Sequence, residues 1–189
     1  ETIHSRKKDN SLIEYIIDTT DDTNIRLTGI AVGDKIGQGK IQKLYSLDGR
    51  DGSFDGSDFQ EGDVLVTEMT DPDWEPIMKK ASAIITNKGG RTCHAAIVAR
   101  EMGVSAIVGT ENGTEVLFNG EEITVSCSEG DIGKVYDGLI PFKLKKTKLD
   151  NLPKTKTPIM LNVASPDLAF KFAQIPNAGV GLAREEFII

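Results

Sequence analysis

The hydrophobic positions of the chain form short runs, separated by turns that contain glycine, aspartate and proline. Between about residues 25 and 70 the runs are short and the turns frequent, which is typical of a compact, sheet-rich unit. The polar segment 1–11 leads into the run "LIEYII", which predicts a first strand. The aspartate-rich segment 48–58 has carboxylates near the spacing of a calcium loop but lacks its terminal glutamate, so we predict a polar hairpin tip.

A short helix is predicted directly after this region. Asp71 or Asp73 is placed to cap it, and Trp74, Ile77 and Met78 share one helical face. Trp74 is therefore expected to lie in the core.

A strand, a loop, a helix and a second strand follow. The apolar runs 82–86 and 105–110 are short, as in buried parallel strands, and 92–102 has a helical pattern that Gly103 ends. This order predicts a βαβ unit with His94 in the first turn of its helix.

The chain changes character near residue 140. Alternating short runs in 120–138 predict the last strands of the first domain, and 141–157 is charged and bounded by prolines, as linkers are. Beyond the linker we predict a buried strand at 159–164, a helix capped by Ser165 with Pro166 at its first position, and a strand that turns into another helix. These last elements cannot bury their own faces as a complete domain.

Composition and charge exclude some classes of partner. A formal net charge of -7 gives no broad basic face for nucleic acid or an anionic membrane, and the basic cluster 143–148 is predicted to be a solvated part of the linker. No apolar run approaches the roughly 20 residues of a membrane span, and no secretory signal opens the chain. Cys93 and Cys127 have neither metal-site spacing nor a disulfide framework, so we expect a reducing, cytoplasmic location.

Candidate chemistry is concentrated around His94. Amides in the first turn of a helix lack intrahelical partners and, with the helix dipole, favour negative charge. Gly89 and Gly90 allow the backbone to approach a ligand closely, and the guanidinium of Arg91 or Arg100 could offset the charge of a phosphate. A free imidazole, with a pKa of about 6.5, is largely neutral at cellular pH and can act as a nucleophile. These residues favour a phosphohistidine carrier.

Simpler roles exist for each of these residues. A histidine at the start of an apolar helix is more often a packing residue, Thr92 a helix N-cap, Cys93 a small buried hydrophobe, and Arg100 a surface charge paired with Glu101 or a neighbour. Metal binding is disfavoured because His4 is the only other histidine. Acyl transfer is disfavoured because neither Ser nor Cys stands in a nucleophile elbow.

The stretch "GGRTCHAAIVAR" at residues 89–100 resembles the phosphohistidine signature of the phosphoenolpyruvate-utilising enzymes. The resemblance extends over nearly the whole chain and implies an α/β fold: a swivelling β/β/α phosphohistidine domain, followed by the first elements of a (β/α) barrel. It implies a linker from an ATP-grasp domain, the swivelling domain, a second linker and the start of the barrel, at residues 1–24, 25–140, 141–157 and 158–189.

The same resemblance implies roles for single residues. His94 would take a pyrophosphoryl group from ATP, the outer phosphate would be hydrolysed, and the phosphoryl group left on His94 would pass to pyruvate. The products would be AMP, phosphate and phosphoenolpyruvate. Thr92 matches a residue that a regulatory kinase/phosphorylase modifies in many bacterial members, and Arg184 matches a substrate-binding arginine of the barrel. Glu185 departs from the family, which often has leucine there, and adds charge beside Arg184.

The resemblance also implies partners. The ATP-grasp and barrel domains of the same enzyme would bring ATP and pyruvate or phosphoenolpyruvate to His94. Magnesium would be bound by parts of the enzyme outside this chain, in which we expect no metal ligands. The chain alone is expected to be inactive in the full, gluconeogenic reaction.

Within the family, the stretches 64–90 and 161–189 are most similar to phosphoenolpyruvate synthase. Pyruvate phosphate dikinase and enzyme I usually have serine where Cys93 stands. A pyruvate phosphate dikinase or a related phosphotransferase is the alternative within the family. An alternative of another class is a non-catalytic docking module for a regulatory protein, with Thr92 as the point of regulation.

Overall fold

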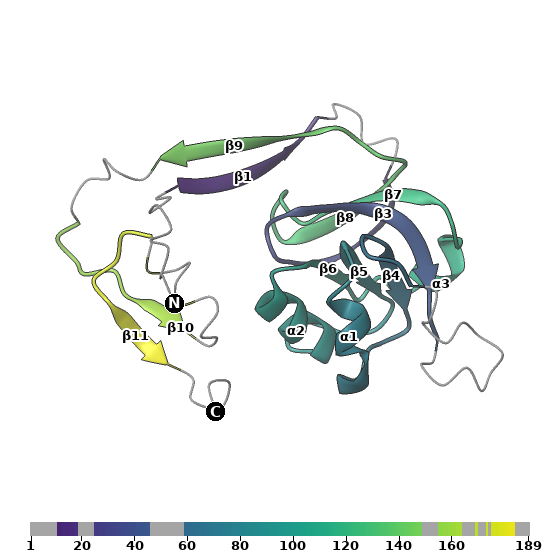
Figure 1. Ribbon diagram of the computed structural model, residues 1–189, viewed down its shortest axis with the longest axis horizontal. Coiled ribbons are helices and arrows are strands. Elements are labelled where there is room, and N and C mark those ends of the chain that lie inside the picture. Colours follow the sequence, from purple (N-terminus) through teal and green to yellow (C-terminus); the bar gives the residue numbers. More distant parts are fainter. Residues whose placement is uncertain are drawn as a thin grey trace, which may run out of the picture. The chain divides into compact units, whose positions relative to one another are not determined.

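The computed structural model describes residues 11–18, 25–45, 59–148, 155–163, 169, 173 and 175–183 (Figure 1). The chain divides into two compact units. Tyr15–Leu144 forms the larger one, and Glu1–Glu14 together with Lys145–Ile189 forms the smaller one. His94 belongs to the larger unit.

The larger unit is built on a closed barrel of β-strands. Strands β3, β4, β5 and β6 are parallel neighbours, and β7, β8 and β2 complete the barrel through antiparallel pairings. The order around the barrel is β2-β6-β5-β4-β3-β7-β8. The strands are β2 Ile25–Val32, β3 Ile36–Lys43, β4 Val64–Thr67, β5 Ala83–Thr86, β6 Ser105–Val108, β7 Glu122–Ser126 and β8 Ile132–Asp137.

Side chains of the parallel strands alternate between the inside and the outside of the barrel. Val64 and Val66 of β4 pack with Ile107 in the barrel interior, whereas Leu65 and Ile84 belong to a second core cluster that includes helical residues. Every residue of β4, β5 and β6 is buried as a result. This double burial explains why these strands appear in the sequence as continuous apolar runs.

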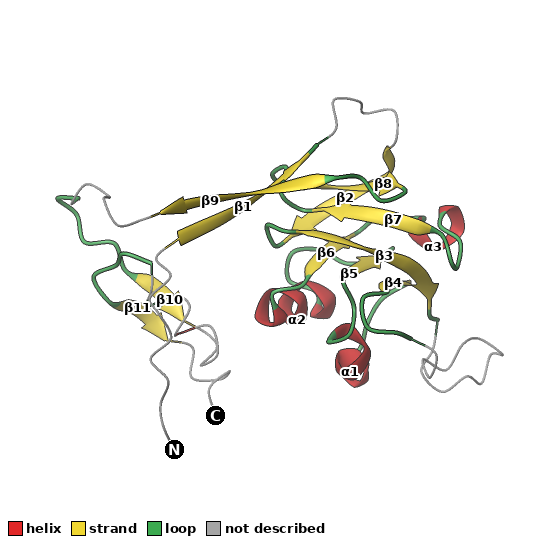
Figure 2. Cartoon of the chain, turned by 45° about the horizontal axis from the view of Figure 1, so that its top comes forward, coloured by secondary structure: helices red, strands yellow, loops and turns green. Residues whose placement is uncertain are grey.

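Helices α1 and α2 lie on the outer side of the parallel strands (Figure 2). The parallel neighbours β5 and β6 are joined through α2, so the predicted βαβ unit is confirmed. Trp74 and Met78 are buried in the outer cluster, also as predicted, but Asp71 makes no side-chain capping bond. The helices are η2 Pro72–Trp74 (a 3-10 turn), α1 Glu75–Met78, α2 His94–Met102 and α3 Gly113–Val116.

Strands β1 (Ser11–Ile17) and β9 (Phe142–Lys148) pair in a two-stranded sheet, here called the ribbon. Glu14 forms an ion pair with Lys145 at 3.0 Å, and the amide of Asp18 donates to the carbonyl of Pro141 at 2.8 Å. These partners show that the two strands run in opposite directions.

Part of the segment predicted to be a linker forms a strand of the ribbon. The basic cluster at 143–148 is exposed, as predicted, but it lies in strand β9. Its backbone groups pair with β1, a segment more than a hundred residues away, which no local pattern could indicate. The boundary between the two compact units falls within the ribbon.

The backbone between β8 and β9 is fastened to the barrel by Thr124 and Gln38. Thr124 Oγ1 donates to the carbonyl of Gly138 at 2.9 Å and accepts from the amide of Ile140 at 2.9 Å and from Gln38 Nε2 at 2.8 Å. Gln38 Nε2 also donates to the carbonyl of Ile140 at 2.7 Å, and the amide of Gly138 donates to the carbonyl of Glu122 at 2.9 Å. A hydroxyl has one donor and two acceptor positions, so that of Thr124 is fully used.

In the smaller unit, β10 (Leu161–Val163) and β11 (Val180–Ala183) form a parallel pair. Leu161 and Val163 are only partly buried, and all of β11 is exposed. The prediction of a buried strand at this position was wrong, because a two-stranded pair leaves its faces open.

Some predictions concern residues outside the described ones. These are the hairpin tip at 48–58, the helix start at Ser165 and Pro166, and the environment of Arg184 and Glu185. Among the described helices, none has the length and apolar character needed to cross a membrane.

Candidate functional site

Helix α2 begins at His94, which occupies its first helical position. Cys93 is the N-cap, with extended backbone (φ -70, ψ 161) and no capping hydrogen bond from its side chain. The first helical bond runs from the amide of Ile97 to the carbonyl of Cys93, at 3.0 Å. The simpler role considered for Thr92, that of the helix N-cap, is therefore wrong by one residue. The first-turn amides receive no side-chain cap, so they remain suited to binding an anion.

The imidazole of His94 is held by Thr70, which no motif in the sequence indicates. Thr70 Oγ1 lies 2.9 Å from His94 Nδ1, and Thr70 is buried while His94 is half-buried. Thr70 follows β4 and His94 follows β5, and these two strands are parallel neighbours. The parallel pairing brings both residues to the same end of the sheet, which no spacing in the sequence indicates.

This bond separates the roles of the two ring nitrogens. When the Thr70 hydroxyl accepts from Nδ1–H, Nε2 carries the lone pair and is the nucleophilic atom.

The two glycines before the helix differ in what the fold requires of them. Gly89 has a φ of 123°, and a Cβ on it would lie 2.7 Å from Cys93 Sγ. A Cβ on Gly109, which also has a positive φ, would lie 2.8 Å from the carbonyl oxygen of Gly89. Gly90 has no positive φ, and a Cβ there would meet nothing within 4 Å. The internal structure therefore requires glycine at 89 and leaves open space at 90.

The predicted phosphate-binding cations are occupied by other groups. Arg100 Nη1 donates to the carbonyl of Arg91 at 2.7 Å, which folds the Arg100 side chain back along α2. Arg91 Nη2 pairs with Asp131 Oδ1 at 3.0 Å, and both side chains are more than half exposed. Exposed pairs of this kind contribute little free energy, so Arg91 is free to exchange partners. Thr92, between them, is exposed.

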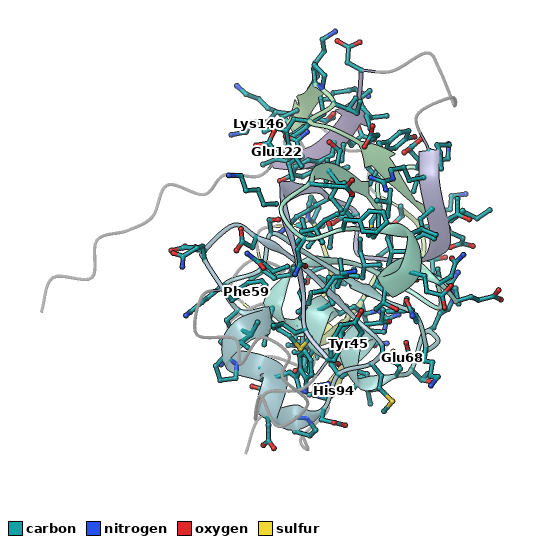
Figure 3. The ribbon with its side chains drawn as sticks, turned by 90° about the vertical axis from the view of Figure 1, so that its right-hand side faces the viewer. Tyr45, Phe59, Glu68, His94, Glu122 and Lys146 are labelled. Carbon is teal, nitrogen blue, oxygen red and sulfur yellow. The ribbon has the colours of Figure 1, made fainter. Side chains whose placement is uncertain are left out.

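Glu68 and Lys88, the charged residues just after β4 and β5, are also paired. Glu68 Oε1 lies 2.9 Å from Lys88 Nζ, and Glu68 Oε2 accepts from Asn87 Nδ2 at 2.7 Å. The hydrogen bonds from Lys88 and then Asn87 lower the pKa of Glu68. Figure 3 shows Glu68 and His94 toward the same end of the domain.

The two cysteines are free thiols in different surroundings. Cys127 is buried in the barrel, where desolvation raises the pKa of its thiol to about 11, and its Sγ contacts the carbonyl of Ala106 at 3.2 Å. Cys93 is half-buried beside Gly89. Within the described part of the chain, no group of three or more His, Cys, Asp or Glu residues is arranged to hold a metal ion.

Comparison with known proteins identifies relatives of this site. Residues 59–130, which include Thr70 and His94, match the model of the PEP-utilising enzyme mobile domain. The chain is 56% identical to a phosphoenolpyruvate synthase of Aquifex aeolicus over 192 residues, covering 100% of this chain and 22% of the relative. It is 50% identical over 189 residues to that of Neisseria meningitidis, covering 100% and 23%, and 53% identical over 161 residues to that of Escherichia coli, covering 85% and 20%.

The chain thus spans about a fifth of the length of these curated relatives. Among solved structures, an NMR structure of Enzyme I (nEIt) is 31% identical over 43% of this chain and 34% of that one. Its TM-score of 0.37 is too low to show a common fold. Because the matched segment holds the histidine and its threonine partner, residues 59–130 belong to the mobile-domain family of the PEP-utilising enzymes, and the chain as a whole is similar to phosphoenolpyruvate synthases.

Proposed function

We propose that this chain is the phosphocarrier portion of a phosphoenolpyruvate synthase, in which His94 carries the phosphoryl group. One observation carries the proposal: Thr70 Oγ1 binds His94 Nδ1 at 2.9 Å, so that Nε2 is the ring nitrogen left to react. The position of His94 at an uncapped helix start and the synthase relatives support it.

The proposed chemistry takes place in three steps. The lone pair of His94 Nε2 attacks the β-phosphorus of ATP, an N–P bond forms, and the bond from that phosphorus to the bridging oxygen breaks, so AMP leaves with the electron pair. Water then releases the outer phosphate. The remaining phosphoryl group passes to the enolate oxygen of pyruvate, which gives phosphoenolpyruvate and returns the lone pair to Nε2.

Three parts of this chain would assist that chemistry. The Thr70 hydroxyl accepts a hydrogen bond from Nδ1–H and holds the ring orientation while the imidazole carries positive charge. The first-turn amides of α2 bind phosphoryl oxygens, and Gly90 leaves space for the donor to approach. Arg91 is placed to exchange Asp131 for the phosphoryl group, whereas Arg100 supports Arg91 through its carbonyl.

Magnesium and ATP are proposed as in the family. Magnesium, which neutralises phosphate charge when bound, would be held by other parts of the full-length protein. A cytoplasmic location and a role in gluconeogenesis belong to the same proposal.

A carrier that visits separate ATP and pyruvate sites has to move between them. We assign residues 25–140 to the swivelling domain, 1–24 and 141–157 to its connections, and 158–189 to the start of a pyruvate-binding barrel. The exposed ribbon supports the connections, and the parallel pair of β10 and β11 supports the barrel, whose strands are parallel. Arg184 is its proposed substrate-binding residue.

From the similarity to the PEP-utilising enzymes, we also propose that the protein is regulated by phosphorylation of Thr92. Its side chain is exposed directly before the N-cap of α2, where a modifying enzyme could reach it. A phosphate on Thr92 would compete with phosphoryl on His94 for the same amides and would repel it.

Intact-mass spectrometry tests the function. The full-length protein is mixed with ATP and magnesium, and the same is done with His94→Ala. We expect an acid-labile phosphoryl adduct that only the wild type forms. An adduct that persists in His94→Ala, or none in either protein, would refute the carrier and favour the docking module. Dependence of turnover on water or on inorganic phosphate as second acceptor separates the synthase from the dikinase.

A further inference from the structure

The first residue after β5, Asn87, has a buried side-chain amide in which both polar atoms are used. Its Nδ2 donates to Glu68 Oε2 at 2.7 Å and to Thr114 Oγ1 at 2.6 Å. Its Oδ1 accepts from the backbone amide of Thr114 at 3.0 Å. Glu68 lies just after β4, and Thr114 belongs to α3, so one amide joins three segments.

The backbone around Asn87 continues the sheet beyond the strands. The amide of Asn87 donates to the carbonyl of Thr67 at 3.1 Å, and that of Lys88 to the carbonyl of Glu68 at 2.9 Å. On the other side, the amide of Glu111 donates to the carbonyl of Asn87 at 3.0 Å. The segment leading toward His94 is therefore held between the extensions of β4 and β6.

The Asn87 amide with its partners Glu68 and Thr114 is here called the bridge. Both segments that lead to the imidazole begin beside it. Thr70, which binds Nδ1, comes two residues after Glu68, and Gly89, which packs on Cys93, comes two residues after Asn87. The bond between Glu68 and Asn87 thus lies at the base of both segments.

The donors and acceptors of the bridge can be arranged in one way only. Thr114 offers a backbone donor to Oδ1, which directs Nδ2 toward Glu68. Glu68 is kept as a carboxylate by Lys88 and Asn87, so its partner has to be a donor. A carboxylate at position 87 would place two negative groups within hydrogen-bonding distance.

We propose that Asn87 is a positioning residue for His94: its amide, bound to Glu68 and Thr114, holds the Thr70 hydroxyl on Nδ1. This inference rests on the proposed function of His94. It assigns Asn87 no contact with substrate, and its effect passes through the Thr70–His94 bond.

Asn87→Asp tests the proposal because it keeps the shape of the side chain and removes both donors. We expect phosphorylation of His94 in the full-length protein to slow by about tenfold or more, and the ¹⁵N resonance of His94 Nδ1, assigned against His94→Ala, to move. Glu68→Gln alone should slow it less than threefold, since the new amide still offers an acceptor oxygen.

The double variant Asn87→Asp/Glu68→Gln reverses the polarity of the bridge. The amide introduced at 68 donates to the carboxylate introduced at 87, and the Thr114 amide and hydroxyl donate to it as well. We expect the rate to return to within about threefold of the wild type and the Nδ1 resonance to return to its position. Glu75→Gln, which breaks the exposed pair with Lys79, is the matched control and should change neither.

Melting temperatures separate positioning from stability. A double variant that regains the melting temperature but neither the rate nor the resonance would overturn the proposal, as would a normal rate and resonance in Asn87→Asp. If neither the rate nor the melting temperature recovers, the reversed bridge does not form and the proposal also fails. Failure of the wild type to accept phosphate would refute the function, while the Nδ1 resonance still tests the bridge.

Discussion

Thr70 Oγ1 and His94 Nδ1 are joined by a 2.9 Å hydrogen bond across 24 residues of sequence. The bond connects the segment after β4 to the first residue of α2. Because Thr70 is buried, water competes little with it, and the bond holds the ring in one orientation.

Removing that hydroxyl should slow the chemistry more than it weakens the fold. In Thr70→Val we expect phosphorylation of His94 to fall about fivefold or more, as the loss of roughly 1 kcal/mol from one hydrogen bond implies. Thr70→Ser should retain most of the rate. Rapid-quench measurement of phosphohistidine checks this, and equal rates in Thr70→Val and the wild type would contradict it.

The two glycines of the loop should respond differently to the same substitution. Gly89→Ala has to strain a positive φ and meet Cys93 Sγ, so it should destabilise the fold by about 1–3 kcal/mol. Gly90→Ala should leave the free energy of unfolding within roughly 0.5 kcal/mol of the wild type. Urea unfolding compares them, and equal losses would show that the loop differs from this geometry.

The C-terminus of α2 should depend on Lys35. Its Nζ donates to the carbonyl of Gly103 at 2.6 Å, where the helix dipole favours positive charge. Lys35→Met should lower the free energy of unfolding by about 1 kcal/mol. Lys40→Met, at an exposed position on β3, is the control. A loss of the same size in both variants would argue against the cap.

Cys127 predicts how stability depends on alkaline pH. Burial raises the pKa of its thiol from 9.0 to about 11, so the folded state holds the proton more tightly than the unfolded state. This stabilisation is fully present below pH 9 and is lost as the pH rises through about 11, up to roughly 2–3 kcal/mol. Unfolding curves between these pH values should converge for the wild type and Cys127→Ala. A constant difference would contradict the raised pKa.

The sequence was sufficient where structure is local. The unit from β5 through α2 to β6, the burial of Trp74 and the glycine that ends α2 all follow from hydrophobic period and turn chemistry. The placement of His94 in the first turn of α2 is confirmed, although threonine is the better N-cap by propensity and Cys93 takes that position.

Long-range pairing could not be predicted. Closure of the barrel depends on register between distant strands, and β9 looked like a linker because its lysines face solvent. The partners of His94 were hidden for the same reason. Thr70 reaches it only because β4 and β5 lie side by side, and Asp131 occupies Arg91 from the turn before β8.

The fastening of Gly138 and Ile140 by Thr124 and Gln38 has a mechanical consequence. A backbone hinge bends where its N–H and C=O groups can change partners. Here the N–H and C=O groups of Gly138 and Ile140 are already hydrogen-bonded. A force applied at the start of β9 would therefore be transmitted to β3 and β7 and would not be absorbed by bending at residues 138–140. Movement at the start of β9 would then reach β5, which His94 follows, through the closed barrel that contains β3, β5 and β7.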